Sequence, residues 1–243
     1  MVVLPKSSSK TRGHIRLSQT AARPHATNGF QLTETSYFRT GLYPADKFPY
    51  ILGREGSGTI VSVGSGNVHG LSVGDRVVYM STGAYAEYTA APALHTAKIP
   101  TAVSSDVAAA SLLQGLTALT LIRESYEVKK DDWILVHAAA GGVGLLLLQL
   151  IKAVGGKAIG TVSTPEKAEL ALKNGAVEVI NYGSANEDVE KRVKEITGGV
   201  GVIASLDGVG KATFDVSLAS LARKGTFVSF GNASGAVPPL TIA

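Results

Sequence analysis

The second half of the chain alternates short apolar runs with segments of helical periodicity. The apolar runs are rich in branched residues throughout, which is typical of strands buried on both faces. Regular alternation of strands and helices predicts right-handed crossovers and a doubly wound parallel sheet. The predicted strands are Trp133–Ala138, Lys157–Val162, Val177–Asn181, Val200–Leu206 and Gly225–Phe230. The predicted helices are Ser105–Leu113, Gly115–Glu124, Val143–Val154, Glu166–Lys173, Asp188–Thr197 and Lys211–Leu221.

Residues 31–104 follow a different rhythm, in which short apolar runs are interrupted by glycine. Runs of β-branched and aromatic residues predict strands at Thr59–Val63, Arg76–Tyr79 and Ala84–Thr89. The glycines between them indicate tight turns. The chain is therefore predicted to be an α/β protein, with a small β-rich domain over residues 31–104 and a doubly wound domain over residues 105–243.

Charge is distributed unevenly along the chain. The formal net charge is +4, but residues 1–30 contain five basic and no acidic residues, which leaves the remaining residues at −1. A body of this charge argues against a nucleic-acid-binding surface. We interpret residues 1–30 as a basic tail, either a mitochondrial transit peptide or an extension without a structural role.

The absence of some residue types narrows the function further. The chain has no cysteine, which excludes disulfides, thiol catalysis and cysteine-ligated zinc. Since no run of about 18 apolar residues occurs, we expect no membrane-spanning segment. These features favour a cytoplasmic protein, with a mitochondrial location as the alternative.

A glycine-rich segment joins the first strand of the alternating half to the helix that follows. It runs from His137 through three alanines to Gly141, Gly142, Val143 and Gly144. A helix N-terminus attracts a pyrophosphate, and small residues let the backbone approach it. In this strand–turn–helix context the motif predicts dinucleotide binding, the alternative being a tight turn without a ligand. We interpret His137 as a packed core histidine rather than an acid or base.

The end of the second predicted strand indicates which nicotinamide cofactor binds. NAD sites usually place an acidic residue here, which accepts a hydrogen bond from the ribose 2′-hydroxyl. This strand instead ends at Ser163 and Thr164, with Lys167 shortly after and no acid at its tip. Ser163 and Lys167 offer a hydroxyl and a cation to a 2′-phosphate, which predicts NADP. The alternative is that Ser163 or Thr164 only caps the next helix and that Lys167 is an exposed helix lysine.

Several sequence blocks together resemble the quinone oxidoreductase (zeta-crystallin-like) branch of the medium-chain dehydrogenase/reductase family. These blocks are residues 37–44, 113–118, 131–135, 139–144, 160–164, 179–182 and 228–235. The resemblance implies a GroES-like catalytic domain beside a Rossmann domain, with NADP(H) as cofactor. It implies a quinone or a related α,β-unsaturated carbonyl compound as substrate, and a homodimer as the assembly. An enoyl reductase, or a non-catalytic NADPH-binding protein with a structural or RNA-binding role, stays open as an alternative.

The resemblance also implies particular site residues. In the catalytic domain they are Tyr37, Arg39 and Tyr43. The implied cofactor contacts are Thr117, Gly141, Gly142, Val143, Gly144, Ser163, Lys167, Tyr182, Ser229, Phe230 and Gly231. No metal is expected, because Arg54 stands where zinc-bearing relatives have a histidine ligand.

The chain departs from the family pattern at both ends. Leu32 occupies the place of an asparagine that faces the cofactor in the family, and residues 1–31 match none of the pattern. The family pattern also continues beyond Ala243. We therefore expect both domains to be truncated and quinone turnover to be low.

Overall fold

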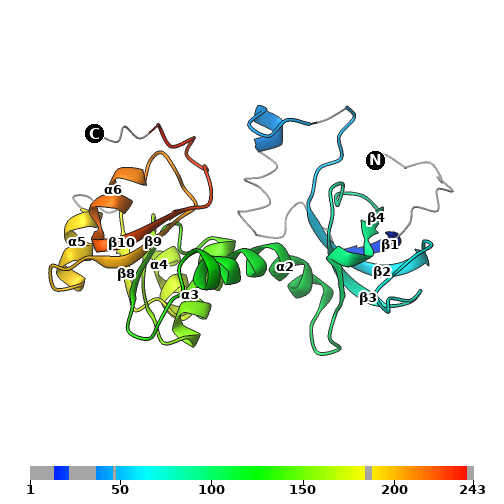
Figure 1. The fold of residues 1–243 in the computed structure, drawn as a ribbon, viewed down its shortest axis with the longest axis horizontal. Coiled ribbons are helices and arrows are strands. Elements are labelled where there is room, and N and C mark those ends of the chain that lie inside the picture. The colour runs from blue at the N-terminus through cyan, green and yellow to red at the C-terminus, as the bar shows by residue number, and fades with distance from the viewer. Residues whose placement is uncertain (1–13, 22–36, 46–47, 184–187, 240–243) are drawn as a thin grey trace. The chain divides into compact units, whose positions relative to one another are not determined.

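The computed structural model describes residues 14–21, 37–45, 48–183 and 188–239. The chain divides into two compact units, residues 1–114 and 115–243. Helix α2 (Ser105–Thr120) runs from the first unit into the second (Figure 1). Our expected boundary lay before this helix, whereas the units divide within it.

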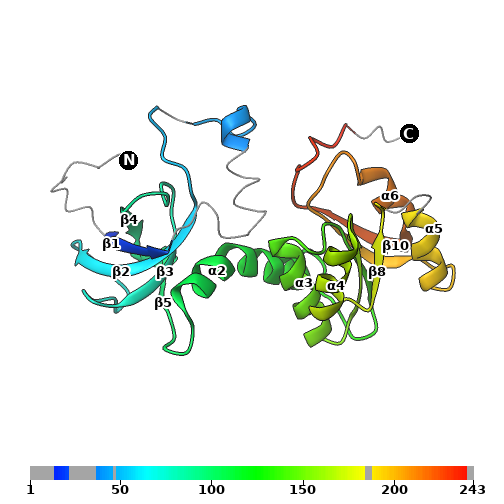
Figure 2. The same ribbon diagram turned by 180° about the vertical axis from the view of Figure 1, so that it is seen from behind.

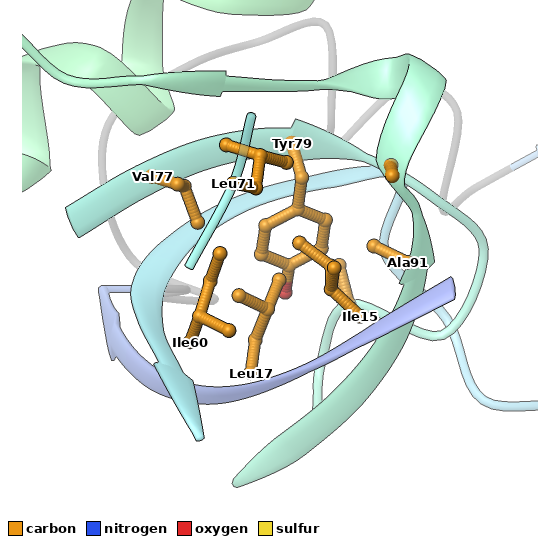
Figure 3. Close-up of a cluster of buried hydrophobic side chains, with 9 residues drawn as sticks. Ile15, Leu17, Ile60, Leu71, Val77, Tyr79 and Ala91 are labelled. Atoms are coloured by element: carbon orange, nitrogen blue, oxygen red, sulfur yellow. The ribbon is translucent and has the colours of Figure 1, made fainter. Parts of the chain in front are cut away.

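The first unit is built on a five-stranded antiparallel sheet with the order β4-β1-β2-β3-β5. One face of the sheet curves around an apolar core, in which the side chains of Leu17, Val77 and Tyr79 are fully buried (Figure 3). The strands are β1 (His14–Ala21), β2 (Glu55–Val63), β3 (Arg76–Met80), β4 (Tyr88–Pro92) and β5 (Thr96–Lys98).

Strand β1 corrects our interpretation of residues 1–30 as a tail. Residues 14–21 pair with β2 on one side and with β4 on the other, so they lie inside the sheet. Ile15 and Leu17 belong to the core, while Arg16 is exposed and its guanidinium carbon lies 4.8 Å from the centre of the Tyr88 ring. We interpreted the segment from its net charge and therefore did not recognise this alternation of apolar and polar positions. The other residues of the expected tail lie outside the described ones.

Three further elements differ from those expected. The predicted strand Ala84–Thr89 is misplaced, because β4 begins only at Tyr88. The short strand β5 was not predicted at all. The two helices expected on either side of Gln114 form the single helix α2, which ends in a π-helical turn over Leu121–Ser125.

The second unit contains a five-stranded parallel sheet with the order β10-β9-β6-β7-β8, which confirms the predicted doubly wound architecture. Its strands are β6 (Trp133–Val136), β7 (Lys157–Val162), β8 (Glu178–Asn181), β9 (Val202–Asp207) and β10 (Leu221–Ser229). The helices are α3 (Gly142–Ala153), α4 (Pro165–Lys173), α5 (Val189–Ile196) and α6 (Phe214–Ala219).

The order of these strands determines where the helices lie. The chain proceeds from β6 outward to β8, then returns to β9 and β10 on the other side of β6. Right-handed crossovers therefore put α3 and α4 on one face of the sheet and α5 and α6 on the other. Figures 1 and 2 show α5 and α6 together, apart from α3 and α4. Burial on both faces explains why the strand sequences are nearly apolar throughout.

Helix α2 and its π-helical turn are together long and apolar enough to cross a membrane, judged by length and composition alone. We expected no such segment, because the sequence has no uninterrupted run of about 18 apolar residues. One such helix is weak support for a membrane protein. Its first half is bonded to strand β2: the Ser57 hydroxyl donates to the Ser105 carbonyl (2.9 Å), and the Leu113 N–H donates to the buried Glu55 carboxylate (2.8 Å).

The core position of β1 predicts that shortening Leu17 destabilises the first unit. Leu17→Ala removes buried methyl groups and should lower the free energy of unfolding by about 2–5 kcal/mol. Val61→Ala, at a side chain that is 42% exposed in β2, is the matched control and should change it by less than about 0.5 kcal/mol.

Urea unfolding can follow the two units separately. The only tryptophan, Trp133, lies in β6 of the second unit, so its fluorescence reports that unit, while circular dichroism reports both. Leu17→Ala should shift the first unit's transition and leave the Trp133 transition in place. Equal midpoints for Leu17→Ala and Val61→Ala would contradict the placement of β1 in the core.

Candidate cofactor-binding site

The predicted cofactor residues of the second unit gather at one edge of its sheet. Because all five strands are parallel, their carboxyl ends share that edge. The glycine turn follows β6, Ser163 follows β7, Tyr182 follows β8, and Ser229 ends β10. Ligands of doubly wound sheets bind at this edge, where the strand order reverses. Here the reversal occurs at β6, which lies between β9 and β7.

The glycine turn leads into helix α3 without a side-chain cap. Gly141 is the N-cap residue and, as a glycine, provides no side-chain oxygen to cap the first turn of the helix. By contrast, Thr164 and Asp188 cap α4 and α5 with their side-chain oxygens. An uncapped N-terminus combines free N–H donors with the positive end of the helix dipole. The start of α3 is therefore suited to an anionic group such as a pyrophosphate.

Small residues hold this turn close to the sheet. A methyl group on Gly144 would lie 2.5 Å from the Ala138 carbonyl oxygen, so a larger residue would push the helix away. Ala138 itself has a φ of 49°, in the left-handed region that residues other than glycine rarely adopt. One strand further on, a methyl group on Gly160 would lie 2.7 Å from the Ala139 side chain. The turn therefore depends on residues with little or no side chain.

The two hydroxyl groups at the end of β7 have different hydrogen-bond partners. Thr164 caps α4, with its Oγ1 accepting a hydrogen bond from the Lys167 N–H (3.3 Å). Ser163 is left to accept a bond from the Lys167 ammonium group (3.1 Å). A hydroxyl and a cation thus meet at the tip of β7. This is the pair that we predicted for a 2′-phosphate.

Tyr182 lies beside this pair at the same edge. Its N–H donates to the carbonyl of Val162, the last residue of β7 (3.0 Å). The next residue, Gly183, packs so closely that a methyl group there would lie 2.2 Å from the Ser163 carbonyl oxygen. The Tyr182 side chain is 52% exposed, which leaves its ring accessible to a ligand next to Ser163.

The segment from Ser229 to Gly231 lies at the other end of this edge. The Phe230 N–H donates to the Asp207 carbonyl (2.9 Å), which joins the segment to the end of β9. A methyl group on Gly231 would lie 2.6 Å from the Gly208 carbonyl oxygen. The segment is therefore held against the loop that follows β9.

The three predicted catalytic residues lie in the first unit. A short helical turn over residues 37–40 begins the segment, and the Tyr43 N–H donates back to the Tyr37 carbonyl (3.1 Å). The two tyrosine rings pack edge to face with centroids 5.0 Å apart. Phe38 packs on the Tyr43 ring and stacks on Tyr50, contacts that we did not predict. Arg39 is exposed.

For two further residues that the resemblance singled out, the expected role stays a prediction. Thr117 lies in the second half of α2 and is half-buried, and its part in the site stays a prediction. Leu32 lies outside the described residues. In the part of the chain that the structure describes, no group of three or more His, Cys, Asp or Glu residues could hold a metal ion.

His137 is buried at the start of the glycine turn, as we expected for a core histidine. Its Nδ1 lies 3.0 Å from the Thr161 hydroxyl, and its Nε2 lies 2.9 Å from the Ser217 hydroxyl. Ser217 in turn donates to the Asp207 carboxylate (2.8 Å). Burial lowers the pKa of His137, and the negative charge of Asp207 opposes this only in part. The imidazole is therefore neutral at pH 7.

Sequence reasoning did not find Asp207 or Ser217. Both are fully buried, and Asp207 also accepts hydrogen bonds from the N–H groups of Val209 and Gly210 (2.8 and 3.0 Å). The signal available in the sequence was an acidic residue followed by glycine at the end of an apolar strand. That signal does not reveal Ser217, because its contact with His137 spans 80 positions.

Comparison with protein families matches both units. The family model for the alcohol dehydrogenase GroES-like domain matches residues 25–101, and the model for zinc-binding dehydrogenases matches residues 142–243. The first range contains strands β2 to β5 of the antiparallel sheet, but not β1, and the second contains strands β7 to β10 of the parallel sheet, but not β6. The matched ranges therefore agree with the two architectures.

Individual relatives point in the same direction. Quinone oxidoreductase 1 of Escherichia coli is 50% identical over 204 residues, which are 83% of this chain and 62% of that protein. The solved structure of Escherichia coli quinone oxidoreductase complexed with NADPH has a TM-score of 0.87 and 46% identity, over 95% of this chain and 68% of that one. The 2-haloacrylate reductase of a Burkholderia species is 36% identical over 98% of this chain and 70% of its own length. The chain thus spans about 62% of the length of the first of these relatives.

The neutral state of His137 predicts that the protein loses stability below pH 6.5. The unfolded chain binds a proton with a pKa of about 6.5, whereas the folded chain resists it, so unfolding takes up a proton below that pH. The stabilisation is complete above pH 6.5 and declines as the pH falls, by at most about 1.4 kcal/mol per pH unit. His137→Gln cannot titrate and should flatten this decline. Urea unfolding followed by Trp133 fluorescence between pH 7.5 and 5.5 measures the stability of the unmutated protein and of the His137→Gln variant. An equal decline in the two would contradict the assignment of a neutral His137.

Proposed function

The chain belongs to the quinone oxidoreductase family of medium-chain dehydrogenases/reductases, and on this basis we propose that it is an NADPH-dependent, metal-free reductase of quinones. The observation that carries the proposal is the edge of the parallel sheet where an uncapped helix N-terminus lies one strand from the Ser163–Lys167 pair. An NADPH complex is known for a relative 46% identical to this chain. The two features suit the pyrophosphate and the 2′-phosphate of that cofactor.

Each part of the edge has a distinct role in the proposal. The N–H groups of Gly142 to Gly144 bind the pyrophosphate, and Ser163 and Lys167 bind the 2′-phosphate. Tyr182 lies along the adenosine. The segment from Ser229 to Gly231 and Thr117 border the nicotinamide. When bound, NADPH would supply a hydride, while the protein supplies orientation and electrostatics.

We assign the substrate side to Tyr37, Arg39 and Tyr43. The two tyrosine rings are fixed against each other and by Phe38, so their hydroxyl groups are carried on a defined aromatic cluster. Arg39 is exposed and offers a cation to the oxygen that becomes negative when a quinone accepts a hydride. A proton from solvent then completes the hydroquinone.

A cytoplasmic location and a homodimer remain predictions.

An α,β-unsaturated carbonyl compound is the second candidate substrate. The observation in its favour is the 36% identity to a 2-haloacrylate reductase over 70% of that protein's length. Both substrates accept hydride at a carbon or oxygen conjugated to a carbonyl group. The cofactor chemistry would therefore be the same for both, and the shape of the substrate pocket would decide between them. A purely structural NADPH-binding protein would bind the cofactor and reduce neither compound.

The Ser163–Lys167 pair predicts a preference for NADPH over NADH. A charge-assisted hydrogen bond contributes about 1.5–3 kcal/mol, so NADPH should bind at least about tenfold more tightly. Lys167→Ala should remove most of this preference. Lys173→Ala, an exposed lysine in the last turn of the same helix, is the matched control and should leave it unchanged. Fluorescence titration with both cofactors measures the ratio, and equal affinities in the unmutated protein would refute the NADP assignment.

The proposed reaction predicts consumption of NADPH when a quinone is added. The absorbance of NADPH can be followed with 9,10-phenanthrenequinone, and in parallel with an acyclic enone, with and without a chelator. We expect faster oxidation with the quinone and no effect of the chelator, because no metal takes part. Inhibition by the chelator, reversed by added zinc, would contradict the metal-free mechanism. NADPH binding without turnover of either compound would favour the structural role.

A further inference from the structure

We propose that His137 is a positioning residue for the bound cofactor, acting through Ser217 and Asp207. The inference rests on the proposed NADPH-binding function and adds residues that the family resemblance did not supply. Thr161, His137, Ser217 and Asp207 are all at most 3% exposed, and they form an unbroken series of hydrogen bonds of 2.8–3.0 Å. The series runs across the carboxyl ends of β7, β6 and β9 and includes one residue of α6.

The direction of each hydrogen bond in this series follows from its carboxylate end. One oxygen of Asp207 accepts from the N–H groups of Val209 and Gly210 and from the Thr213 hydroxyl, and the other accepts from Ser217. Ser217 has then used its only proton, so it accepts a bond from His137 Nε2–H. His137 Nδ1 carries no proton as a result and accepts from the Thr161 hydroxyl. A single neutral tautomer satisfies every group.

This series connects the two ends of the proposed cofactor site. On one side, His137 immediately precedes the glycine turn. Its backbone N–H donates to the Leu206 carbonyl (3.2 Å), and the Ala139 N–H donates to the Thr161 carbonyl (3.0 Å). On the other side, Asp207 holds the loop after β9, and its own carbonyl accepts from the Phe230 N–H (2.9 Å). A shift of Ser217 or Asp207 would therefore change the spacing between the pyrophosphate turn and the nicotinamide segment.

The same strand offers a matched control. Ser205 lies in β9, is fully buried like Ser217, and its hydroxyl has no hydrogen-bond partner within the described part of the chain. Ser217→Ala leaves the Asp207 oxygen and the His137 N–H unsatisfied, whereas Ser205→Ala removes a hydroxyl that satisfies nothing. Loss of a buried partner is costly, and loss of an unpaired hydroxyl is not. The two substitutions are chemically identical and differ only in the hydrogen bonds that they remove.

The experiment titrates both variants with NADPH and with adenosine 2′-monophosphate. The second ligand carries the 2′-phosphate for Ser163 and Lys167 but has no phosphate on the 5′-carbon and no nicotinamide. We expect Ser217→Ala to weaken NADPH binding about tenfold and to change binding of the monophosphate by less than about twofold. Ser205→Ala should change neither. A residue with only a structural role would not alter the ratio of the two affinities.

Equal changes for both ligands in Ser217→Ala, or no change in either, would overturn the proposal. An unmutated protein that fails to bind NADPH would instead refute the proposed function, which keeps the two failures apart. If Ser217→Ala does not fold, Thr161→Val breaks the series at its other end with little change in shape and should show the same ratio. Nitrogen-15 spectra of the His137 ring in the unmutated protein give a second readout. Protonation at Nε2 alone is expected at pH 7, and protonation at Nδ1 would overturn the proposal.

Discussion

Helix α3 begins so close to strand β6 that no side chain fits between the turn and the helix. Gly144 faces the carbonyl oxygens of Ala138 and Ala139, at distances where a methyl group would overlap them. Gly160 on the neighbouring strand leaves room for the Ala139 side chain. This packing fixes the height at which α3 starts above the sheet edge. As a result, the N–H donors at the start of α3 lie at that edge.

The polar groups at the same edge impose a second constraint. Buried polar atoms are costly unless each one finds a partner, and a fully satisfied network holds its members in one arrangement. Asp207 meets this requirement with four donors, and His137 meets it only as one neutral tautomer. The edge therefore combines a rigid, satisfied interior with an uncapped helix start. The rigid part supports the positions at which a ligand would bind.

Much of this arrangement could be predicted from local sequence. The apolar strands of the second unit and the turn ending at Gly144 are periodic or short-range signals, and the structure reproduces them. Strand β1 could not be predicted from net charge, because Ile15 and Leu17, which belong to the core, stand among basic and polar residues. Which of Ser163 and Thr164 caps the helix could not be predicted from sequence, since the side chain of either residue can cap a helix. The hydrogen bonds from Thr161 to Asp207 join residues that are far apart in the chain, so no local sequence pattern predicts them.

NADPH should bind at the carboxyl edge of the parallel sheet, and amide hydrogen exchange tests this most directly. Mass spectrometry of peptides from the protein with and without saturating NADPH locates the protected amides. We predict slower exchange in peptides covering residues 139–145 and 163–167, with weaker protection of the second peptide by NADH. Protection confined to other parts of the chain, or none at either segment, would contradict the assignment of the cofactor site.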